Sequence, residues 1–259
     1  MRYPILMAAA GACAVAGVIT LSVWPGSTTP SPLAPVPREG DWLNRHAEFV
    51  ALARRGDVSI VFFGDSLTDH WRDTGQAIWA KHFEPLGAVN FGIGSDGTQN
   101  VLWRVQNGEL PPDGARVVVL LIGTVNLNPP AARADDVADG VTTVVQEIRR
   151  RSPRTRILLL GLLPRGARPN PVRDKVQAVN AIIAKLADHE HVHYLDLGSR
   201  LLGSDGTLPS DVAPDAVHLS AAGYQIWADA MLGSLRDLLA RDAPGRVWPA
   251  GGPSTGLDV

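Results

Sequence analysis

The sequence has very little cysteine and no surplus of either charge. Cys13 is the single cysteine among 259 residues, which excludes an internal disulfide and a cysteine-based zinc site. The 24 Lys and Arg residues nearly balance the 26 Asp and Glu residues, so the formal net charge is −2. This balance argues against a nucleic-acid-binding protein, for which a pI above about 9 is typical. With 45% hydrophobic and 19% charged residues, the chain is too apolar to be disordered and suits one sizeable core.

The first 24 residues are typical of an export segment. Arg2 provides a positive charge, and the uncharged run that starts at Ile5 is long enough to cross a bilayer core of about 30 Å. Residues 1–24 therefore predict a signal peptide or a membrane anchor, and an extracytoplasmic protein that is secreted or held at the membrane. A lipid-modified Cys13 and a buried core helix are the alternative interpretations.

The composition also marks a linker and a tail. Residues 25–40 are rich in Pro, Ser and Thr and are interpreted as a stiff, poorly packing linker. Residues 244–259 are rich in Gly and Pro, which predicts a disordered tail. Residues 41–243 remain and suit a single domain.

Short apolar runs alternate with longer segments of helical pattern in this domain. The expected strands are residues 58–63, 88–91, 116–122, 156–160 and 192–195. The expected helices are residues 75–83, 98–106, 134–151, 171–187 and 220–240. Continuous apolar strands separated by helices predict an α/β fold with a five-stranded, mostly parallel sheet covered on both faces.

Polar residues follow the first three expected strands. These clusters are Gly64-Asp65-Ser66, residues 92–98, and the run from Gly123 to Asn126. In parallel sheets of this kind, ligands bind beyond the carboxyl ends of the strands. The sequence therefore predicts a functional site at this edge.

Ser66 in the first of these clusters, together with two residues just before the last expected helix, suggests nucleophilic catalysis. Ser66 follows a strand directly, and a serine hydroxyl needs a base before it becomes an effective nucleophile. His218 is the best candidate base, and Asp215, three residues earlier, is placed to orient its ring. The alternatives are a helix-capping role for Ser66 and a surface or capping role for His218.

These residues belong to motifs that resemble the GDSL, or SGNH, serine hydrolases. Gly64-Asp65-Ser66-Leu67 is similar to the first block of that family, and Asp215-x-x-His218 to the last. Within the family, the chain most resembles the catalytic subunits of platelet-activating-factor acetylhydrolase and their bacterial relatives. The stretches that carry this resemblance are residues 90–94, 101–110, 161–166 and 169–170, and the resemblance extends from about residue 41 to 239.

The resemblance implies a three-layer α/β/α, flavodoxin-like fold with no metal and no cofactor. It implies hydrolysis of a short-chain acyl ester, such as an acetyl ester, through an acyl-serine intermediate. Ser66 would be the nucleophile, His218 the general base and acid, and Asp215 its orienting partner. The substrate would be a small-molecule ester or an ester on a surface glycan or lipid, and since relatives often dimerise, a homodimer is a further expectation.

Two positions depart from the family pattern at the oxyanion hole. Ser95 replaces a glycine whose backbone N–H would contact the oxyanion beside that of Ser66, and serine accepts fewer backbone conformations than glycine. Val125 replaces an asparagine that would donate from its side chain. Losing one such donor typically costs about 2.7–4 kcal/mol of transition-state stabilisation. Asn126 or Ser95 would then replace the donor, although alternation of side chains points Asn126 elsewhere.

Other interpretations follow from these departures and from two charged segments. The domain would otherwise be a slow enzyme, a catalytically weakened surface-binding module, or an acyltransferase that uses the same triad.

His189, His191 and His193 alternate and would share one face of a strand, which is a weak metal-site pattern without a carboxylate anchor. The arginines of residues 149–151 are better explained by favourable charge at a helix C-terminus than by phosphate binding.

Overall fold

The computed structural model describes residues 31–56 and 58–241. Its strands are β1 (Ile60–Gly64), β2 (Ala88–Gly92), β3 (Val117–Leu121), β4 (Arg156–Leu160) and β5 (Val192–Leu195). Its α-helices are α1 (Asp41–Ala53), α2 (Ser66–Asp69), α3 (Gln76–His82), α4 (Thr98–Gln106), α5 (Ala134–Arg151), α6 (Pro171–Ile183) and α7 (Ala221–Ala240). Short 3-10 helices are η1 (His70–Arg72), η2 (Glu84–Leu86), η3 (Val125–Leu127), η4 (Ala184–Leu186) and η5 (Gly198–Leu201).

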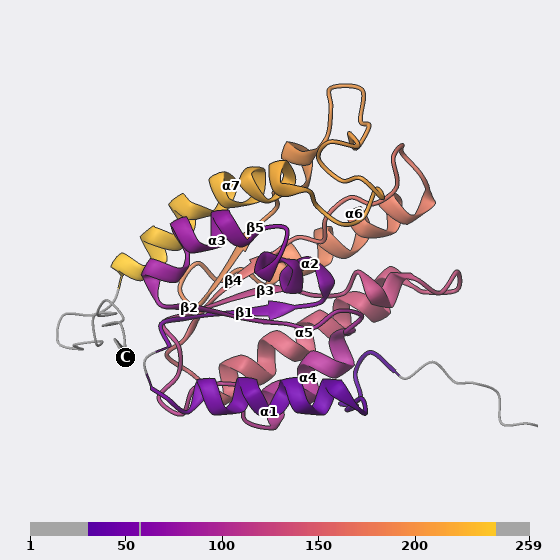
Figure 1. Cartoon of the computed structure of the whole chain (residues 1–259). Coiled ribbons are helices and arrows are strands. Elements are labelled where there is room, and N and C mark those ends of the chain that lie inside the picture. Colours follow the sequence, from indigo (N-terminus) through magenta and orange to yellow (C-terminus); the bar gives the residue numbers. More distant parts are fainter. Residues whose placement is uncertain (1–30, 57, 242–259) are drawn as a thin grey trace, which may run out of the picture.

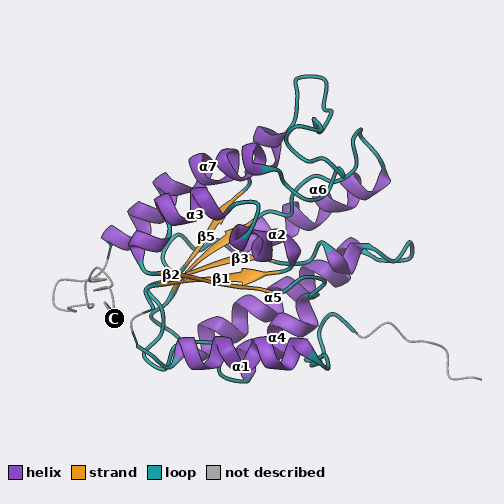
Figure 2. Cartoon of the chain, viewed as in Figure 1, coloured by secondary structure: helices purple, strands orange, loops and turns teal. Residues whose placement is uncertain are grey.

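The five strands form one parallel sheet in the order β2-β1-β3-β4-β5. Helices cover both faces of this sheet (Figure 2). α3 and α7 pack together on one face, while α1, α4 and α5 lie on the other, where α6 packs against α5 (Figure 1). The predicted three-layer α/β/α fold is therefore confirmed.

Burial explains why these segments became strands and helices. All residues of β1 and β3 are buried, as expected for strands covered on two faces. α5 buries one stripe that includes Val137, Val141 and Ile148, has acidic residues in its first turn, and ends in three arginines. Arg150 and Arg151 bond Glu147 on the same helix. The arginine run therefore lies in the last turn of α5, where the sequence analysis expected it.

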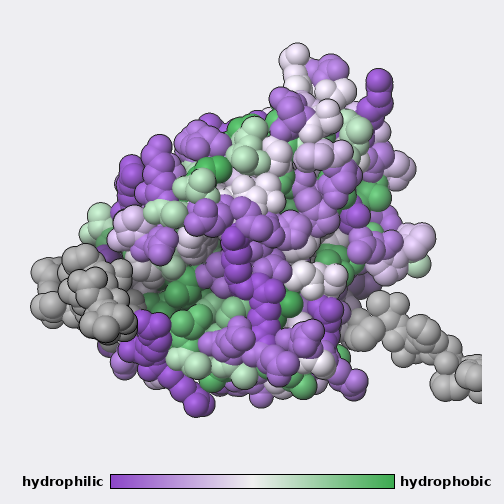
Figure 3. Space-filling view, in the orientation of Figure 1, coloured by the Kyte–Doolittle hydropathy of each residue, from purple (hydrophilic) through white to green (hydrophobic). Residues whose placement is uncertain are grey.

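The boundaries of α4 and α5 agree with the sequence prediction, whereas α1 was not predicted. α1 buries only Trp42, Phe49 and Ala53 among many polar residues, so its apolar stripe is sparse. The viewed surface is largely hydrophilic, with a limited hydrophobic area between the two helical layers (Figure 3). Leu33 and Leu43 are the exposed large hydrophobic side chains of the described residues.

The predicted export segment, residues 1–24, and the predicted tail, residues 244–259, lie outside the described residues. Within residues 31–56 and 58–241, no helix has the length and apolar character needed to cross a membrane. Part of the predicted linker is described, and it is packed. Thr98 Oγ1 donates to Pro32 O at 2.9 Å, and Val36 bonds residues of α4, so this part contacts the domain where a poorly packing spacer was expected.

Candidate active site

Two glycines allow α2 to sit directly on the carboxyl ends of the strands. Gly64 and Gly92 are paired in register at the ends of β1 and β2. A Cβ on Gly64 would lie 2.0 Å from Thr68 Oγ1, and one on Gly92 would lie 2.3 Å from the backbone nitrogen of Asp69. Because neither strand end carries a side chain here, α2 approaches closely and places Ser66 at the edge of the sheet.

Asp65, not Ser66, caps the N-terminus of α2. Asp65 Oδ1 accepts a hydrogen bond of 3.0 Å from the backbone N–H of Leu67. This bond satisfies one of the free N–H groups of the first turn. The Ser66 hydroxyl is therefore released from the capping role that the sequence left open, and it bonds another residue.

The structure brings Ser66, His218 and Asp215 together although 152 positions separate Ser66 from His218. Ser66 Oγ lies 2.9 Å from His218 Nε2, and His218 Nδ1 lies 2.6 Å from Asp215 Oδ2. The other carboxylate oxygen of Asp215 accepts from the backbone N–H groups of Val217 and His218, at 2.9 and 2.7 Å. The hydroxyl, the imidazole and the carboxylate thus form the hydrogen-bonded chain that activates a serine nucleophile.

The loop that carries Asp215 and His218 is held between these two residues and at the start of α7. Gly166 donates its backbone N–H to Ala216 O at 2.7 Å, and Ala216 has a left-handed φ of 60°. Ser220 follows the loop and caps α7 by accepting from the N–H of Gly223. These contacts keep the imidazole over Ser66 while the side chains of His218 and Asp215 remain 37% and 57% exposed.

The carboxyl group of Asp215 is ionised over the whole physiological range. Burial on its own would raise the pKa of Asp215, but hydrogen bonds from the His218 ring and from the backbone of His218 and Val217 lower it to about 2. A permanent negative charge therefore faces Nδ1 of His218. That charge favours the tautomer whose Nε2 accepts the Ser66 proton.

Asp65 is a buried carboxyl group next to the nucleophile. It is 1% exposed, and its Oδ2 has no hydrogen-bond partner among the described residues. The pKa of Asp65 is raised from 3.8 to about 7, chiefly by burial and in addition by the charge of Asp96, although the bond from Leu67 and the proximity of His218 act in the opposite direction. The folded protein therefore binds this proton more tightly than the unfolded chain, so Asp65 makes the protein less stable as pH rises from about 4 to about 7.

Asp65→Asn is expected to remove this part of the pH dependence. Relative to the variant, the free energy of unfolding of the wild type should fall by about 1–4 kcal/mol between pH 5 and pH 8. Urea unfolding at both pH values measures the difference. Asp73→Asn is the control, because Asp73 is exposed and bonds to Thr74 lower its pKa, so it stays ionised throughout this window. Parallel pH profiles for wild type and Asp65→Asn would contradict the assignment.

The predicted oxyanion donors have different surroundings. The N–H of Ser66 belongs to the first turn of α2, where backbone donors have no partner within the helix. Ser95 is exposed and has a left-handed φ of 66°, which costs a residue with a Cβ roughly 1–2 kcal/mol. Val125 begins η3 and offers no side-chain donor. The loop thus retains the glycine-like backbone conformation although the residue is serine.

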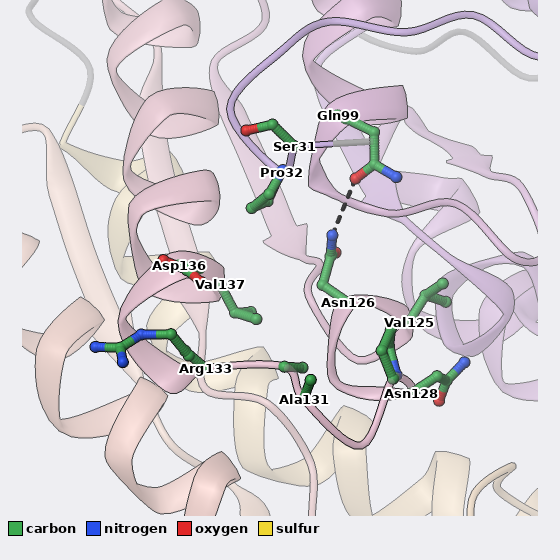
Figure 4. A pocket seen from close by; sticks show the side chains of 12 residues that line it. Ser31, Pro32, Gln99, Val125, Asn126, Asn128, Ala131, Arg133, Asp136 and Val137 are labelled. Atoms are coloured by element: carbon green, nitrogen blue, oxygen red, sulfur yellow. Dashed lines mark hydrogen bonds between the residues drawn. The ribbon is translucent and has the colours of Figure 1, made fainter. Parts of the chain in front are cut away.

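Asn126 is engaged elsewhere, as the alternation of side chains suggested. Its Oδ1 accepts from the N–H of Thr98 at 2.9 Å. Its Nδ2 donates to Gln99 Oε1, also at 2.9 Å (Figure 4). Both ends of the amide are therefore used at the beginning of α4. No hydrogen bond joins Asn126 to Ser66 among the described residues, so this geometry does not support Asn126 as a replacement donor.

A cavity of about 480 Å³ opens beside η3 (Figure 4). Val125 and Asn126 line it together with Gln99 of α4 and Pro32. None of the three triad residues is part of its lining. This cavity is therefore not formed by the triad itself.

Sequence reasoning missed two kinds of residue near the triad. The His70 ring lies 5.1 Å from the His218 ring, centroid to centroid, and nothing in its local sequence marks it. Beneath the site, the fully buried Arg104 guanidinium pairs with Asp96 and Glu109 at 2.9 Å each and donates to Phe91 O at 2.7 Å. Arg104 and Glu109 both lie within the stretch 101–110 that carries the family resemblance, but their pattern in the sequence does not show that the guanidinium is buried.

The alternating histidines do not gather into a ligand set. His191 Nε2 lies 3.6 Å from Glu190, and His193 Nε2 lies 3.4 Å from the backbone oxygen of Glu190. Across residues 31–56 and 58–241, no three His, Cys, Asp or Glu side chains are arranged to hold a metal ion.

The sequence and fold were compared with known proteins. Residues 62–226 match the profile of the GDSL-like Lipase/Acylhydrolase family. The alpha1 subunit of human platelet-activating factor acetylhydrolase IB is 41% identical over 217 residues, which cover 83% of this chain and 92% of the relative.

Solved structures show the same fold at lower identity. A GDSL-like lipase from Bacteroides thetaiotaomicron is 20% identical with a TM-score of 0.63, covering 75% of this chain and 97% of its own. An acetylxylan esterase from Geobacillus stearothermophilus is 19% identical with a TM-score of 0.55, and the match covers 74% of this chain and 98% of the esterase.

Proposed function

The chain belongs to the GDSL-like lipase/acylhydrolase family and is an ester hydrolase, and from this premise we propose that it cleaves a short-chain acyl ester through an acyl-serine intermediate on Ser66. The observation that carries the proposal is the hydrogen-bonded chain from Ser66 Oγ through His218 to Asp215, at 2.9 and 2.6 Å. An acetyl-type acyl group is supported by the names of two similar proteins, an acetylhydrolase and an acetylxylan esterase.

The first half of the reaction forms the acyl-enzyme. His218 Nε2 takes the proton of Ser66 Oγ as this oxygen bonds to the ester carbonyl carbon, and the carbonyl oxygen becomes an oxyanion. Asp215 stabilises the resulting imidazolium through Nδ1–H. The imidazolium then gives its proton to the ester oxygen of the leaving alcohol as the carbon–oxygen bond breaks.

The second half returns the enzyme to its starting state. His218 accepts a proton from a water molecule, whose oxygen attacks the acyl carbon and forms a second tetrahedral intermediate. This intermediate collapses, Ser66 Oγ leaves the carbon and regains the proton from His218, and the carboxylic acid departs. No other reactant is required.

Two backbone groups stabilise the oxyanion in this proposal, the N–H of Ser66 and the N–H of Ser95. The side chain of Val125 contributes nothing, and Asn126 remains bonded to Thr98 and Gln99. The hole is therefore short of one donor, and we expect a slower chemical step than a complete hole would give.

The location and the alcohol portion of the substrate are also proposals. An extracytoplasmic protein that is exported or anchored by residues 1–24 would meet small-molecule esters, or esters on surface glycans and lipids. The uncharged run in that segment supports export.

The proposed function is tested with the complete chain and the ester p-nitrophenyl acetate. The wild type should hydrolyse this ester, and a fluorophosphonate probe should become attached to Ser66, located by mass spectrometry of the digested protein. Ser66→Ala should lower kcat by at least about 10³-fold and abolish labelling. Equal hydrolysis by both proteins would refute the proposal.

A further inference from the structure

The segment before α1 is hydrogen-bonded to the first residues of α4. We call residues 31–40 the N-terminal strap. Val36 N donates to Gln99 O at 3.1 Å, Asn100 Nδ2 donates to Val36 O at 2.9 Å, and Thr98 Oγ1 donates to Pro32 O at 2.9 Å. Figure 1 shows this indigo segment beside α4. The strap therefore reaches the element that follows the loop carrying Ser95.

Arg38 of the strap donates hydrogen bonds to the two residues on either side of Ser95. We call residues 93–97, between β2 and α4, the oxyanion loop. Arg38 Nη1 donates to the backbone oxygen of Gly94 at 2.8 Å and to Asp96 Oδ1 at 3.2 Å. One guanidinium nitrogen therefore spans the residues immediately before and after Ser95.

The other contacts of the oxyanion loop tie it to the interior and to the helix of the nucleophile. Asp96 is fully buried and also accepts from Trp42 Nε1 at 2.8 Å. The N–H of Gly94 donates to Asp69 Oδ2 at 3.2 Å, and Asp69 lies in α2 with Ser66. The oxyanion loop is thus held in the interior through Asp96 and bonded to α2 through the N–H of Gly94. The partly exposed Arg38 bonds both Gly94 and Asp96.

The hydrogen bonds of Gly94 and Asp96 hold Ser95 in place, because Ser95 itself has no hydrogen bond among the described residues. It is exposed and holds a left-handed φ of 66°, a region that residues with a Cβ rarely adopt. An untied serine would relax toward the ordinary regions and turn its peptide N–H. The bond from Arg38 to Gly94 O fixes the orientation of the peptide that precedes Ser95, and this is the peptide whose N–H belongs to Ser95.

We infer that Arg38 is a positioning residue that holds the N–H of Ser95 toward the oxyanion formed at Ser66. This inference rests on the proposed function, because it concerns the oxyanion of the same reaction. Arg38 bonds Gly94 and Asp96, and among the described residues it has no hydrogen bond to the triad. The Arg38 side chain is 41% exposed, and the buried Asp96 keeps Arg104 and Trp42 as partners when Arg38 is replaced, so the effect of Arg38 is expected mainly in the chemical step.

The test measures Arg38→Met and Arg38→Lys in the complete chain with p-nitrophenyl acetate. Arg38→Met should lower kcat by about 10–100-fold with KM within about twofold, because a misplaced donor weakens only the transition state. The rate of fluorophosphonate labelling should fall by a similar factor. Arg38→Lys keeps a charge and a donor, so it should recover part of both rates.

Arg54→Met is the matched control, because it removes an equal charge from an exposed residue that follows α1. It should behave as the wild type. An Arg38→Met protein with wild-type kcat would overturn the inference, as would a variant in which KM rises as much as kcat falls. If Arg38→Met does not fold, Arg38→Lys and Arg38→Gln decide the question by the same criteria.

Amide hydrogen exchange gives a readout that does not depend on activity. Exchange in a peptide covering residues 92–98 should be faster in Arg38→Met and unchanged in Arg54→Met. Unchanged exchange in Arg38→Met would refute the positioning contact even in an inert protein. Faster exchange combined with an inert, unlabelled wild type would instead contradict the proposed function and leave the contact established.

Discussion

Replacing Asp215 by Asn is expected to lower kcat by about 10²–10⁴-fold while KM changes little. The variant removes the negative charge that faces His218 Nδ1 at 2.6 Å, so the imidazolium formed during proton transfer loses its counter-charge. In a buried triad such a change lowers kcat by about 10⁴. Here the carboxylate is 57% exposed, so water screens part of the interaction and the lower end of the range is included.

The asparagine variant separates charge from loop structure. Asp215 Oδ1 accepts two backbone N–H groups, and an asparagine oxygen in the same place keeps both bonds. The thermal stability of Asp215→Asn should therefore remain close to that of the wild type. Steady-state kinetics with p-nitrophenyl acetate, together with a thermal melt, measure the two effects.

Asp211→Asn provides the comparison, because it removes an exposed carboxylate from the same loop. It should retain the wild-type kcat. An Asp215→Asn protein whose kcat stays within about threefold of the wild type would show that His218 acts without a charged partner. Such a result would remove Asp215 from the proposed mechanism.

The elements that the sequence predicted well are those with dense local patterns. The five strands are short apolar runs, and each lies where its run lies within two residues at either end. α5 has both an apolar stripe and opposite charges at its ends, so two independent signals define its boundaries. The placement of Ser66 followed from the rule that ligands bind beyond the strand ends of a parallel sheet, whereas His218 was chosen because Asp215 lies three residues before it.

The features that sequence reasoning missed depend on contacts between distant segments. Proline-rich composition describes how residues 25–40 behave alone, but it contains no information about Thr98 or Asn100, which hold the strap. Arg38 likewise differs from other surface arginines only through its bonds to Gly94 and Asp96. These contacts exist only after β2 and α4 have been placed by the sheet.

The buried Arg104 shows a second limit, which concerns burial and not distance along the chain. Arg104 is fully buried, with Asp96 and Glu109 as its ionic partners and the backbone oxygens of Phe91 and Gly64 as acceptors. A charged residue in a helix is normally expected on the exposed face. Only the position of α4 above the ends of β1 and β2 makes burial of this guanidinium favourable, because there it finds acceptors for its donors.

Val125→Asn is expected to raise kcat by about 10²–10³-fold with little change in KM. Asparagine would bring a side-chain N–H to the position at which the family normally has one, and such a donor typically stabilises the transition state by about 2.7–4 kcal/mol. Ground-state binding does not use this bond, since the oxyanion exists only after attack by Ser66. The increase should therefore appear in kcat.

Val125→Asp and Val125→Ala separate the donor from the change in shape. Aspartate has nearly the shape of asparagine, but when ionised it has no donor and repels an oxyanion, so its kcat should fall below that of the wild type. Alanine removes volume and adds no donor, so it should leave kcat within a few-fold. All three variants are compared with p-nitrophenyl acetate at one pH, after a thermal melt confirms folding.

The outcome of Val125→Asn also distinguishes an incomplete enzyme from a binding protein. A large gain over a slow wild type means that the triad is competent and that the oxyanion hole limits the rate. A wild type that is inert, together with a Val125→Asn protein that is also inert, would favour the surface-binding module. If the wild type is already fast and asparagine adds nothing, the N–H groups of Ser66 and Ser95 suffice, and valine at position 125 carries no catalytic penalty.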